Sequence, residues 1–446
     1  MKKQDYKSKM PAGWRLGGVH CGIKKDKLQF DLALLVSEKP ATAAGVFTTN
    51  QITAPCVQWC GKCVVSGDVR ALVVNSGNAN CCTGEHGTRD NEKVAAIVAR
   101  ELGFEPREVL VGSTGVIGER LPLGKIRSGI KVLARSVGNA GEANEDIVRS
   151  AARAIMTTDT RPKTAERTIM WRGQPVRLLA LAKGAGMIEP RLGPPATAGT
   201  MRSRSAGSSH AGYAGSLRSG EHAATKHATF LCFIMTDARA SRRLLQAILE
   251  DCVSTTFNHL TVDGQTSTND MVIAMANGCS KAPSLDNTPP LASNFAQAMK
   301  DICVDITRQV ASDGEGASVT VIINVIGTAT VRDANFLARA VANSLLVKTA
   351  IYGKQNNYGR ILQAIGCSHA RVNEKNVTIS YGSSKGTATV FRRGVPVPVN
   401  SKKIQKILSS KEVIINVSLG SGTGKCTYYT CDMTPRYVDI NADYIS

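Results

Sequence analysis

Phe230-Leu-Cys-Phe-Ile-Met235 is the stretch that indicates the fold most directly. An unbroken apolar run of this length is typical of a central strand that is buried on both faces of its sheet. Directly after it, Ser241 to Phe257 repeats apolar residues at the spacing of one helical face: Leu244, Leu245, Ile248, Leu249, Cys252 and Val253. A buried strand followed by an amphipathic helix predicts an α/β fold with layered packing.

The same alternation of strand and helix extends in both directions along the chain. Apolar runs at Asp31 to Val36 and Ala71 to Asn75 predict strands, and Asn91 to Leu102 predicts a helix that ends at Gly103. The other expected elements are a helix over Ala143 to Met156, a strand over Val319 to Ile326, a helix over Asp333 to Ser344 and a strand over Glu412 to Val417.

One long segment, Arg191 to His227, interrupts this pattern. It is rich in Ser, Gly, Ala, Arg and His and contains almost no large apolar residues. Such a composition cannot bury enough surface to offset the entropy lost on ordering. We therefore expect a flexible insertion there.

The composition restricts the class of protein. With 446 residues, 43% of them hydrophobic, the chain can bury a sizeable core. The formal charge of +20 raises the question of nucleic-acid binding. However, the basic residues are spread along the chain, and no helix-turn-helix, zinc-finger or RNA-recognition motif is present. We therefore expect a basic enzyme that attracts anionic substrates and has no nucleic-acid partner.

The cysteines indicate a reducing compartment. There are 13, an odd number, and Cys81 is adjacent to Cys82. Cys60 and Cys63 form a C-x-x-C, but no second pair with suitable spacing completes a zinc site, so we expect no metal. No apolar run approaches the ~20 residues of a membrane span. We expect an intracellular protein without a membrane partner, located in the cytoplasm, or in the mitochondrial matrix if the source is eukaryotic.

Four segments contain more Gly, Thr, Asn and Asp than packing requires: Gly112 to Gly118, Thr157 to Thr160, Lys183 to Pro190 with its continuation at Ala228-Thr229, and Asp313 to Gly316. From chemistry alone, each is either a ligand-binding loop or a tight turn between strands. Gly420 to Lys425 fails the P-loop pattern, because Leu419 stands where the first glycine is required. The signatures of serine hydrolases, zinc proteases and kinases are also missing.

Together these segments resemble the ornithine acetyltransferase family (ArgJ-like), also called the bifunctional glutamate N-acetyltransferases of arginine biosynthesis. The likeness covers nearly the whole chain. It rests on Gly18 to Ile23, Pro40 to Asn50, Asn75 to Asn80, Ser113 to Gly118, Thr157 to Thr160, Lys183 to Ile188, Ala228 to Ala238, Thr261 to Gly264, Ser267 to Asp270, Asp313 to Gly316, Tyr358 to Ile361 and Tyr437 to Tyr444. So many matches in order make chance a poor explanation.

The resemblance implies an α/β, layered sandwich like that of N-terminal nucleophile enzymes (DmpA/ArgJ-like), cleaved into α and β chains. The matching bond is Ala228-Thr229, which separates an α chain of residues 1–228, carrying the insertion 191–227, from a β chain of residues 229–446. A threonine hydroxyl needs a base beside it. Cleavage frees the α-amine of Thr229, and an unperturbed α-amine has a pKa of about 7.7–8.0, which suits that role.

The resemblance also implies the remaining site residues. Thr114 and Gly115 match the oxyanion-hole pair of the family. The substrate-contacting positions match Thr157, Lys183, Thr229, Glu315, Asn441 and Ser446. From charge, Lys183 is suited to a substrate carboxylate and Glu315 to the ornithine ammonium or the incoming amine. Thr157 has a second interpretation as a cap or turn residue, and Asp263 and Asn269 are expected to be turn formers.

The implied reaction is a ping-pong transfer. Thr229 takes the acetyl group of N-acetylornithine, ornithine leaves, and glutamate accepts the group. No cofactor is expected, although acetyl-CoA is a second candidate donor. The family further implies a heterotetramer of two α and two β chains.

Several alternatives stay open. Ala196-Thr197 competes with Ala228-Thr229 for the cleavage site, but only Thr229 is followed by the predicted strand. The insertion either loosens the scissile bond or loops out at modest closure cost. The competing functions are an N-terminal nucleophile amidase or peptidase, in which water takes the acyl group, and an uncleaved, inactive basic binding protein.

Overall fold

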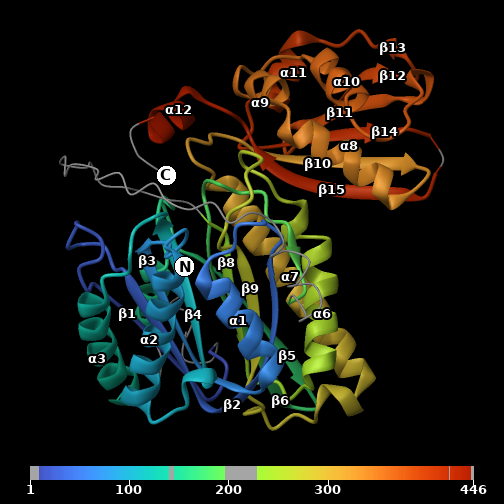
Figure 1. The fold of residues 1–446 in the computed structure, drawn as a ribbon. Coiled ribbons are helices and arrows are strands. Elements are labelled where there is room, and N and C mark those ends of the chain that lie inside the picture. The colour runs from blue at the N-terminus through green and yellow to red at the C-terminus, as the bar shows by residue number, and fades with distance from the viewer. Residues whose placement is uncertain (1–9, 140–144, 196–228, 421, 443–446) are drawn as a thin grey trace.

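The computed structural model describes residues 10–139, 145–195, 229–420 and 422–442 (Figure 1). The strands of the first sheet are β1 Trp14–Val19, β2 Leu32–Thr48, β3 Val69–Asn78, β4 Val109–Val116, β5 Lys163–Trp171, β6 Gln174–Lys183, β7 Leu192–Gly193, β8 Leu231–Thr236 and β9 Met271–Ala276. Their order is β4-β3-β2-β9-β8-β6-β5, and β1 and β7 also pair with β2.

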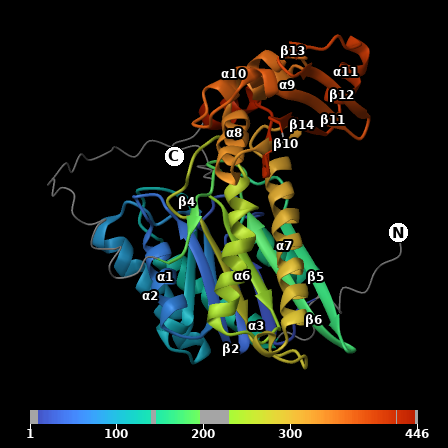
Figure 2. The same ribbon diagram turned by 90° about the vertical axis from the view of Figure 1, so that its right-hand side faces the viewer.

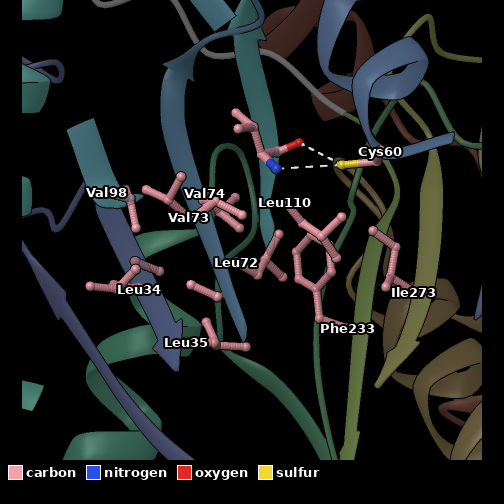
Figure 3. Packing of buried hydrophobic residues seen from close by; sticks show 14 of the residues in the cluster. Leu34, Leu35, Cys60, Leu72, Val73, Val74, Val98, Leu110, Phe233 and Ile273 are labelled. Atoms are coloured by element: carbon pink, nitrogen blue, oxygen red, sulfur yellow. Dashed lines mark hydrogen bonds between the residues drawn. The ribbon is translucent and has the colours of Figure 1, made fainter. Parts of the chain in front are cut away.

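The long strand β2 belongs to both halves of this sheet. Its first half pairs with β1 and β3, and its second half pairs with β9 and β7. The two halves pack face to face. A Cβ added at Gly112 of β4 would lie only 3.4 Å from the Phe233 ring of β8. In Figure 3, Phe233 and Ile273 face Leu72 and Leu110 across this interface.

Helices cover both outer surfaces of the sandwich (Figures 1 and 2). In β8, Leu231, Phe233 and Met235 join the core between the sheets, whereas Cys232 and Ile234 pack against helices α6 and α7. These helices are α6 Arg242–Ser254 and α7 Pro289–Ser312, and the opposite surface carries α2 Gly84–Leu102, α3 Leu123–Asn139 and α4 Glu145–Ala154. The predicted α/β layered sandwich is thus confirmed.

Helix α1, Pro55–Ser66, covers the edge strand β4. Trp59 Nε1 donates to the Val109 carbonyl at 2.8 Å, and the Cys60 thiol contacts both the N–H and the carbonyl of Val111. An open strand edge is a site for unwanted pairing, and these contacts occupy it. The C-x-x-C cysteines are therefore buried packing residues, and no cluster of metal ligands occurs in the described part of the chain.

A second unit follows α7 and has its own core. Its sheet has the order β13-β12-β11-β14-β10-β15, with β10 Thr320–Thr328, β11 Thr378–Ser383, β12 Gly386–Arg392, β13 Val395–Pro396, β14 Glu412–Ser418 and β15 Gly424–Cys431. Its helices are α8 Val331–Asn343, α9 Leu345–Tyr352, α10 Tyr358–Gly366 and α11 Ser401–Leu408. The last helix, α12 Pro435–Ala442, returns toward the first unit (Figure 1). No helix within the described residues is long and apolar enough to cross a membrane.

Several elements differ in extent from the sequence predictions. The strand expected over Asp31 to Val36 is the 17-residue β2, which continues to Thr48. The helix expected from Asn91 already begins at Gly84. The glycine-rich segment from Gly112 continues strand β4 to Val116, so its first part is neither a loop nor a turn. The first residues of the predicted flexible insertion are ordered, because β7 pairs with β2 and Leu192 is buried. Residues 196–228 of that segment lie outside the described residues.

The packing between the two sheet halves predicts a large stability effect at Phe233. We expect Phe233→Ala to lower the free energy of unfolding by about 3–5 kcal/mol, because the ring is fully buried and its removal leaves a cavity. Urea unfolding followed by circular dichroism measures this loss. Met170→Ala is the control, since Met170 is 61% exposed on β5 and its removal should change stability little. Equal losses in the two variants would contradict the face-to-face packing.

Candidate active site

The predicted nucleophile Thr229 lies two residues before the start of β8 and is 3% exposed. Its hydroxyl oxygen is 3.0 Å from the hydroxyl oxygen of Ser267. The Asp270 carboxylate fixes both neighbours, since it accepts hydrogen bonds from Phe230 N at 2.8 Å and Ser267 N at 3.1 Å. The position of the Thr229 hydroxyl is therefore set by the loop before β9. Ala228, on the other side of the predicted scissile bond, lies outside the described residues.

Asp270 itself is an unusual carboxyl group. Burial raises its pKa to about 7, although the two backbone N–H donors and Lys183 act in the opposite direction. A carboxyl group with such a pKa, next to the nucleophile, is typical of a functional site. The sequence patterns included Asp270 in a matching segment but gave it no role.

The predicted oxyanion-hole residues Thr114 and Gly115 lie near the end of β4. Gly115 has φ +136°, and an added Cβ would be 2.2 Å from Asn78 N, so only glycine fits there. The end of β4 is therefore pressed closely against the end of β3.

Asn269 ties this region to the nucleophile loop. Its side-chain amide donates to the carbonyls of Ser113 and Ala79, both at 2.8 Å, and it is fully buried. The sequence predicts Asn269 to be a turn former. It lies in a bend before β9 and, in addition, connects this bend to the segments of Ala79 and Ser113.

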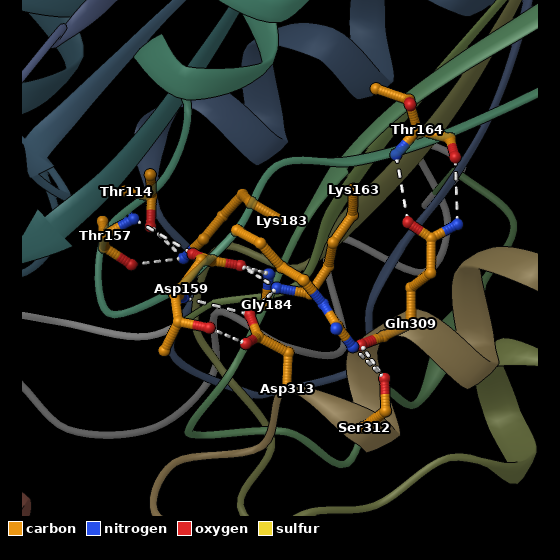
Figure 4. Close-up of polar contacts among 12 residues, drawn as sticks. Thr114, Thr157, Asp159, Lys163, Thr164, Lys183, Gly184, Gln309, Ser312 and Asp313 are labelled. Carbon is orange, nitrogen blue, oxygen red and sulfur yellow. Dashed lines mark hydrogen bonds and ion pairs between the residues drawn. The ribbon is translucent and has the colours of Figure 1, made fainter. Parts of the chain in front are cut away.

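Lys183, at the end of β6, joins two predicted site residues (Figure 4). Its ammonium donates to Thr157 Oγ1 at 2.7 Å and Thr114 Oγ1 at 3.2 Å. Burial lowers the pKa of Lys183 to about 8, although the negative charge of Asp159 acts in the opposite direction. The ammonium thus adds a positive charge directly beside the predicted oxyanion hole. Thr157 is part of this group, and it also lies in the bend that follows α4.

A buried ion-pair network supports Thr157 and Lys183 (Figure 4). The Lys163 ammonium lies 2.6 Å from Asp159 Oδ1 and 2.5 Å from Asp313 Oδ2. The Asp159 carboxylate also accepts from Gly184 N at 2.7 Å and Thr157 N at 3.1 Å. Burial alone would favour the neutral acid, but Lys163 and Lys183 hold the pKa of Asp159 well below its usual range. Sequence reasoning missed Lys163, because no pattern marks it.

The predicted substrate residues Glu315 and Asn441 also lie together. Asn441 Nδ2 donates to Glu315 Oε2 at 2.9 Å, and Glu315 N donates to the Ala185 carbonyl at 2.8 Å. A Cβ at Gly186 would be 2.3 Å from the Glu315 carboxyl carbon, so glycine permits this close approach. Ser446 lies outside the described residues.

Asp263, expected to be a turn former, holds the loop that follows β6. Its carboxylate accepts from Met187 N at 2.7 Å and Ile188 N at 2.9 Å. Burial raises its pKa to about 6, with the backbone donors opposing the rise. The Asp263 side chain therefore organises a turn in a distant segment, in addition to its own.

A cavity of about 670 Å³ opens beside these residues. Thr157 and Glu315 line it, together with the rest of the segments 157–161 and 312–317 and residues from α4 and α12. Its size lies within the range of small-molecule sites. The structure thus joins Lys183 to Thr114 and Thr157 by hydrogen bonds, and Asn441 to Glu315. Thr157 and Glu315 connect the two groups through the cavity wall, whereas Thr229 does not line this cavity. The buried Thr229 hydroxyl, the Lys183 ammonium beside two other hydroxyls and a polar cavity are suited to acyl transfer.

Several known proteins are similar to this chain in sequence. The model of the ArgJ family matches residues 15–446. The arginine biosynthesis bifunctional protein ArgJ of Thermosynechococcus vestitus is 36% identical over 97% of this chain and 96% of its own length. The protein of the same name from Streptococcus thermophilus is 37% identical over the full length of both chains.

Two solved structures are similar at the same level of identity. The crystal structure of the arginine biosynthesis bifunctional protein argJ from Bacillus halodurans is 38% identical, with a TM-score of 0.45, over 48% of this chain and 98% of that one. Ornithine acetyltransferase from Mycobacterium tuberculosis, solved in complex with ornithine, is 38% identical, with a TM-score of 0.37, over 43% of this chain and 98% of that one. Since the family model spans nearly the whole sequence, this chain belongs to the ArgJ family.

Proposed function

We propose that this chain is an acetyltransferase of arginine biosynthesis that moves the acetyl group of N2-acetyl-L-ornithine to L-glutamate. Full-length relatives named as arginine biosynthesis bifunctional proteins support this activity. The observation that carries the proposal is the position of Lys183, whose ammonium bridges Thr114 and Thr157 beside the head of β8, where Thr229 lies. An acyl transfer needs a nucleophile and a fixed positive field at one point, and these residues supply both.

Maturation would cut the chain before Thr229. Cleavage of the Ala228-Thr229 bond gives an α chain of residues 1–228 and a β chain of residues 229–446. The freed α-amine then acts as the base for the Thr229 hydroxyl, which Ser267 orients from 3.0 Å. Asp270 keeps this geometry in place through its bonds to Phe230 N and Ser267 N.

Two half-reactions follow. The Thr229 oxygen attacks the acetyl carbonyl carbon of N-acetylornithine, and its proton passes through the α-amine to the departing amine of ornithine as the C–N bond breaks. The amine of glutamate then attacks the acetyl ester, and the proton that it loses returns to Thr229 as the C–O bond breaks. The negative oxygen of each tetrahedral intermediate is held by Thr114 and Gly115, next to the Lys183 ammonium.

The proposal also covers the second acetyl donor, the assembly of the chains and their location. The word bifunctional in the relatives' names supports acetyl-CoA as a second acetyl donor. We further propose a heterotetramer of two α and two β chains, and an intracellular location. The 13 free cysteines, most of them buried, favour a reducing compartment.

The proposed cleavage is tested by the intact mass of the purified protein and by N-terminal sequencing. We expect two chains, the second beginning Thr-Phe-Leu-Cys-Phe. Thr229→Ala should stay a single chain without activity, because it has no hydroxyl to attack the preceding carbonyl, whereas Thr229→Ser should still be cut. An uncut wild-type chain that transfers acetyl groups would disprove this maturation.

The pKa of Lys183 predicts the alkaline limb of the pH profile. The charged form is the active one, so kcat/KM should fall as the pH rises through about 8 and Lys183 loses its proton. Lys183→Met should lower kcat about 10²- to 10³-fold, as loss of an oxyanion donor does, and remove this limb. Lys24→Met is the control, since burial also lowers the pKa of Lys24 to about 8. If the limb disappears in Lys24→Met and persists in Lys183→Met, the assignment to Lys183 is wrong.

Glutamate dependence separates the transferase from an amidase. With N-acetylornithine alone we expect release of one ornithine per Thr229, because the acetyl-enzyme reacts further only with an acceptor amine. Added L-glutamate should restore turnover. Ornithine release can be followed by mass spectrometry. Continuous release at the same rate without glutamate would instead identify water as the acceptor.

A further inference from the structure

The proposed reaction brings substrates with oppositely charged side chains to one nucleophile. The donor side chain ends in an ammonium group, whereas the side chain of the acceptor glutamate ends in a carboxylate. In a ping-pong transfer both must reach the same Thr229, one after the other. A carboxylate suited to the donor therefore repels the acceptor, unless a positive group lies beside it.

The cavity next to Thr157 contains both signs of charge. Glu315 lies in its wall at 5% exposure, with its carboxylate held by Asn441 Nδ2. The exposed residues Arg153, Arg161 and Arg436 line the same cavity, and they come from α4, the segment before β5 and α12. Among the described residues, no carboxylate forms an ion pair with any of these three arginines.

Two of the arginines are anchored next to the segment that carries Glu315. Arg161 Nη2 donates to Ser312 Oγ at 2.5 Å, directly before Asp313. The backbone of Arg436 packs against Gly316, where an added Cβ would lie 2.9 Å from the Arg436 carbonyl carbon. Arg161 and Arg436 thus flank the segment from opposite ends, with Glu315 between them.

We propose that Arg161 and Arg436 bind the side-chain carboxylate of the acceptor glutamate, beside Glu315, which binds the ammonium of the donor. This inference rests on the proposed function. A guanidinium group offers two parallel N–H donors to a carboxylate, which a lysine cannot do. Because both arginines are exposed and Glu315 is buried, the donor ammonium meets the carboxylate in the wall while the arginines remain solvated. The arrangement selects glutamate as acceptor without excluding the cationic donor.

The two half-reactions can be measured separately in Arg161→Gln, Arg436→Gln and the double variant. Formation of the acetyl-enzyme from N-acetylornithine, followed by intact mass, should stay within about twofold of wild type. The KM for L-glutamate should rise about 10-fold or more in each single variant, as the loss of a hydrogen bond to a charged group predicts. Wild type should prefer L-glutamate to L-glutamine, and the double variant should lose this preference. Arg436→Lys should recover part of the affinity for glutamate.

The matched control is Arg243→Gln, since Arg243 is an exposed arginine of α6 outside the cavity. It should leave both half-reactions unchanged. An unchanged KM for glutamate in the double variant overturns the inference. An equal loss in both half-reactions also overturns it, because the arginines would then bind the α-carboxylate that both substrates share. If wild type forms no acetyl-enzyme at all, the proposed function fails, and this result is distinct from the other two.

Discussion

The site depends on one buried ion-pair network, in which the Lys163 ammonium lies between the carboxylates of Asp159 and Asp313. No side chain of the three is more than 4% exposed. Removing one partner would leave an unpaired charge in the interior, which typically costs about 3–5 kcal/mol. The network fastens the segment before β5 to the segment after α7. Thr157 and Glu315, which lie in these two segments, take their positions in the cavity wall from it.

The second unit completes the site from the other side. Glu189, just after the Lys183 loop, is 2% exposed and pairs with Arg339 of α8, while Asn343 of the same helix donates to it at 3.3 Å. Asn441 of α12 donates a hydrogen bond to the Glu315 carboxylate. The C-terminal residues thus contribute both a support for the loop and a part of the cavity wall. The second unit, which has its own core, thus supports both the Lys183 loop and the wall of the cavity.

Most of the fold could be predicted from the sequence, because its signals are local. The apolar run at Phe230 became β8, and the amphipathic pattern after it became α6, whose Ser241 caps the first turn. Gly103 ends α2 in the left-handed conformation expected of a terminal glycine. Continuity of β2 through both halves of the sheet could not be predicted, since its two partners, β3 and β9, are far apart in the sequence.

The sequence by itself determined the family and the residues that we propose to carry the chemistry. These residues, which stand in matching motifs, are Thr229, Thr114, Gly115, Thr157, Lys183, Glu315 and Asn441. Only the tertiary structure decided how they act on each other. The ammonium of Lys183 faces two hydroxyls, Asn269 crosslinks strand ends, and Lys163 balances two carboxylates. Burial and charge pairing arise between segments up to about 150 residues apart. Local sequence patterns do not predict such pairs, because the free energy of a buried charge depends on the groups that the fold places beside it.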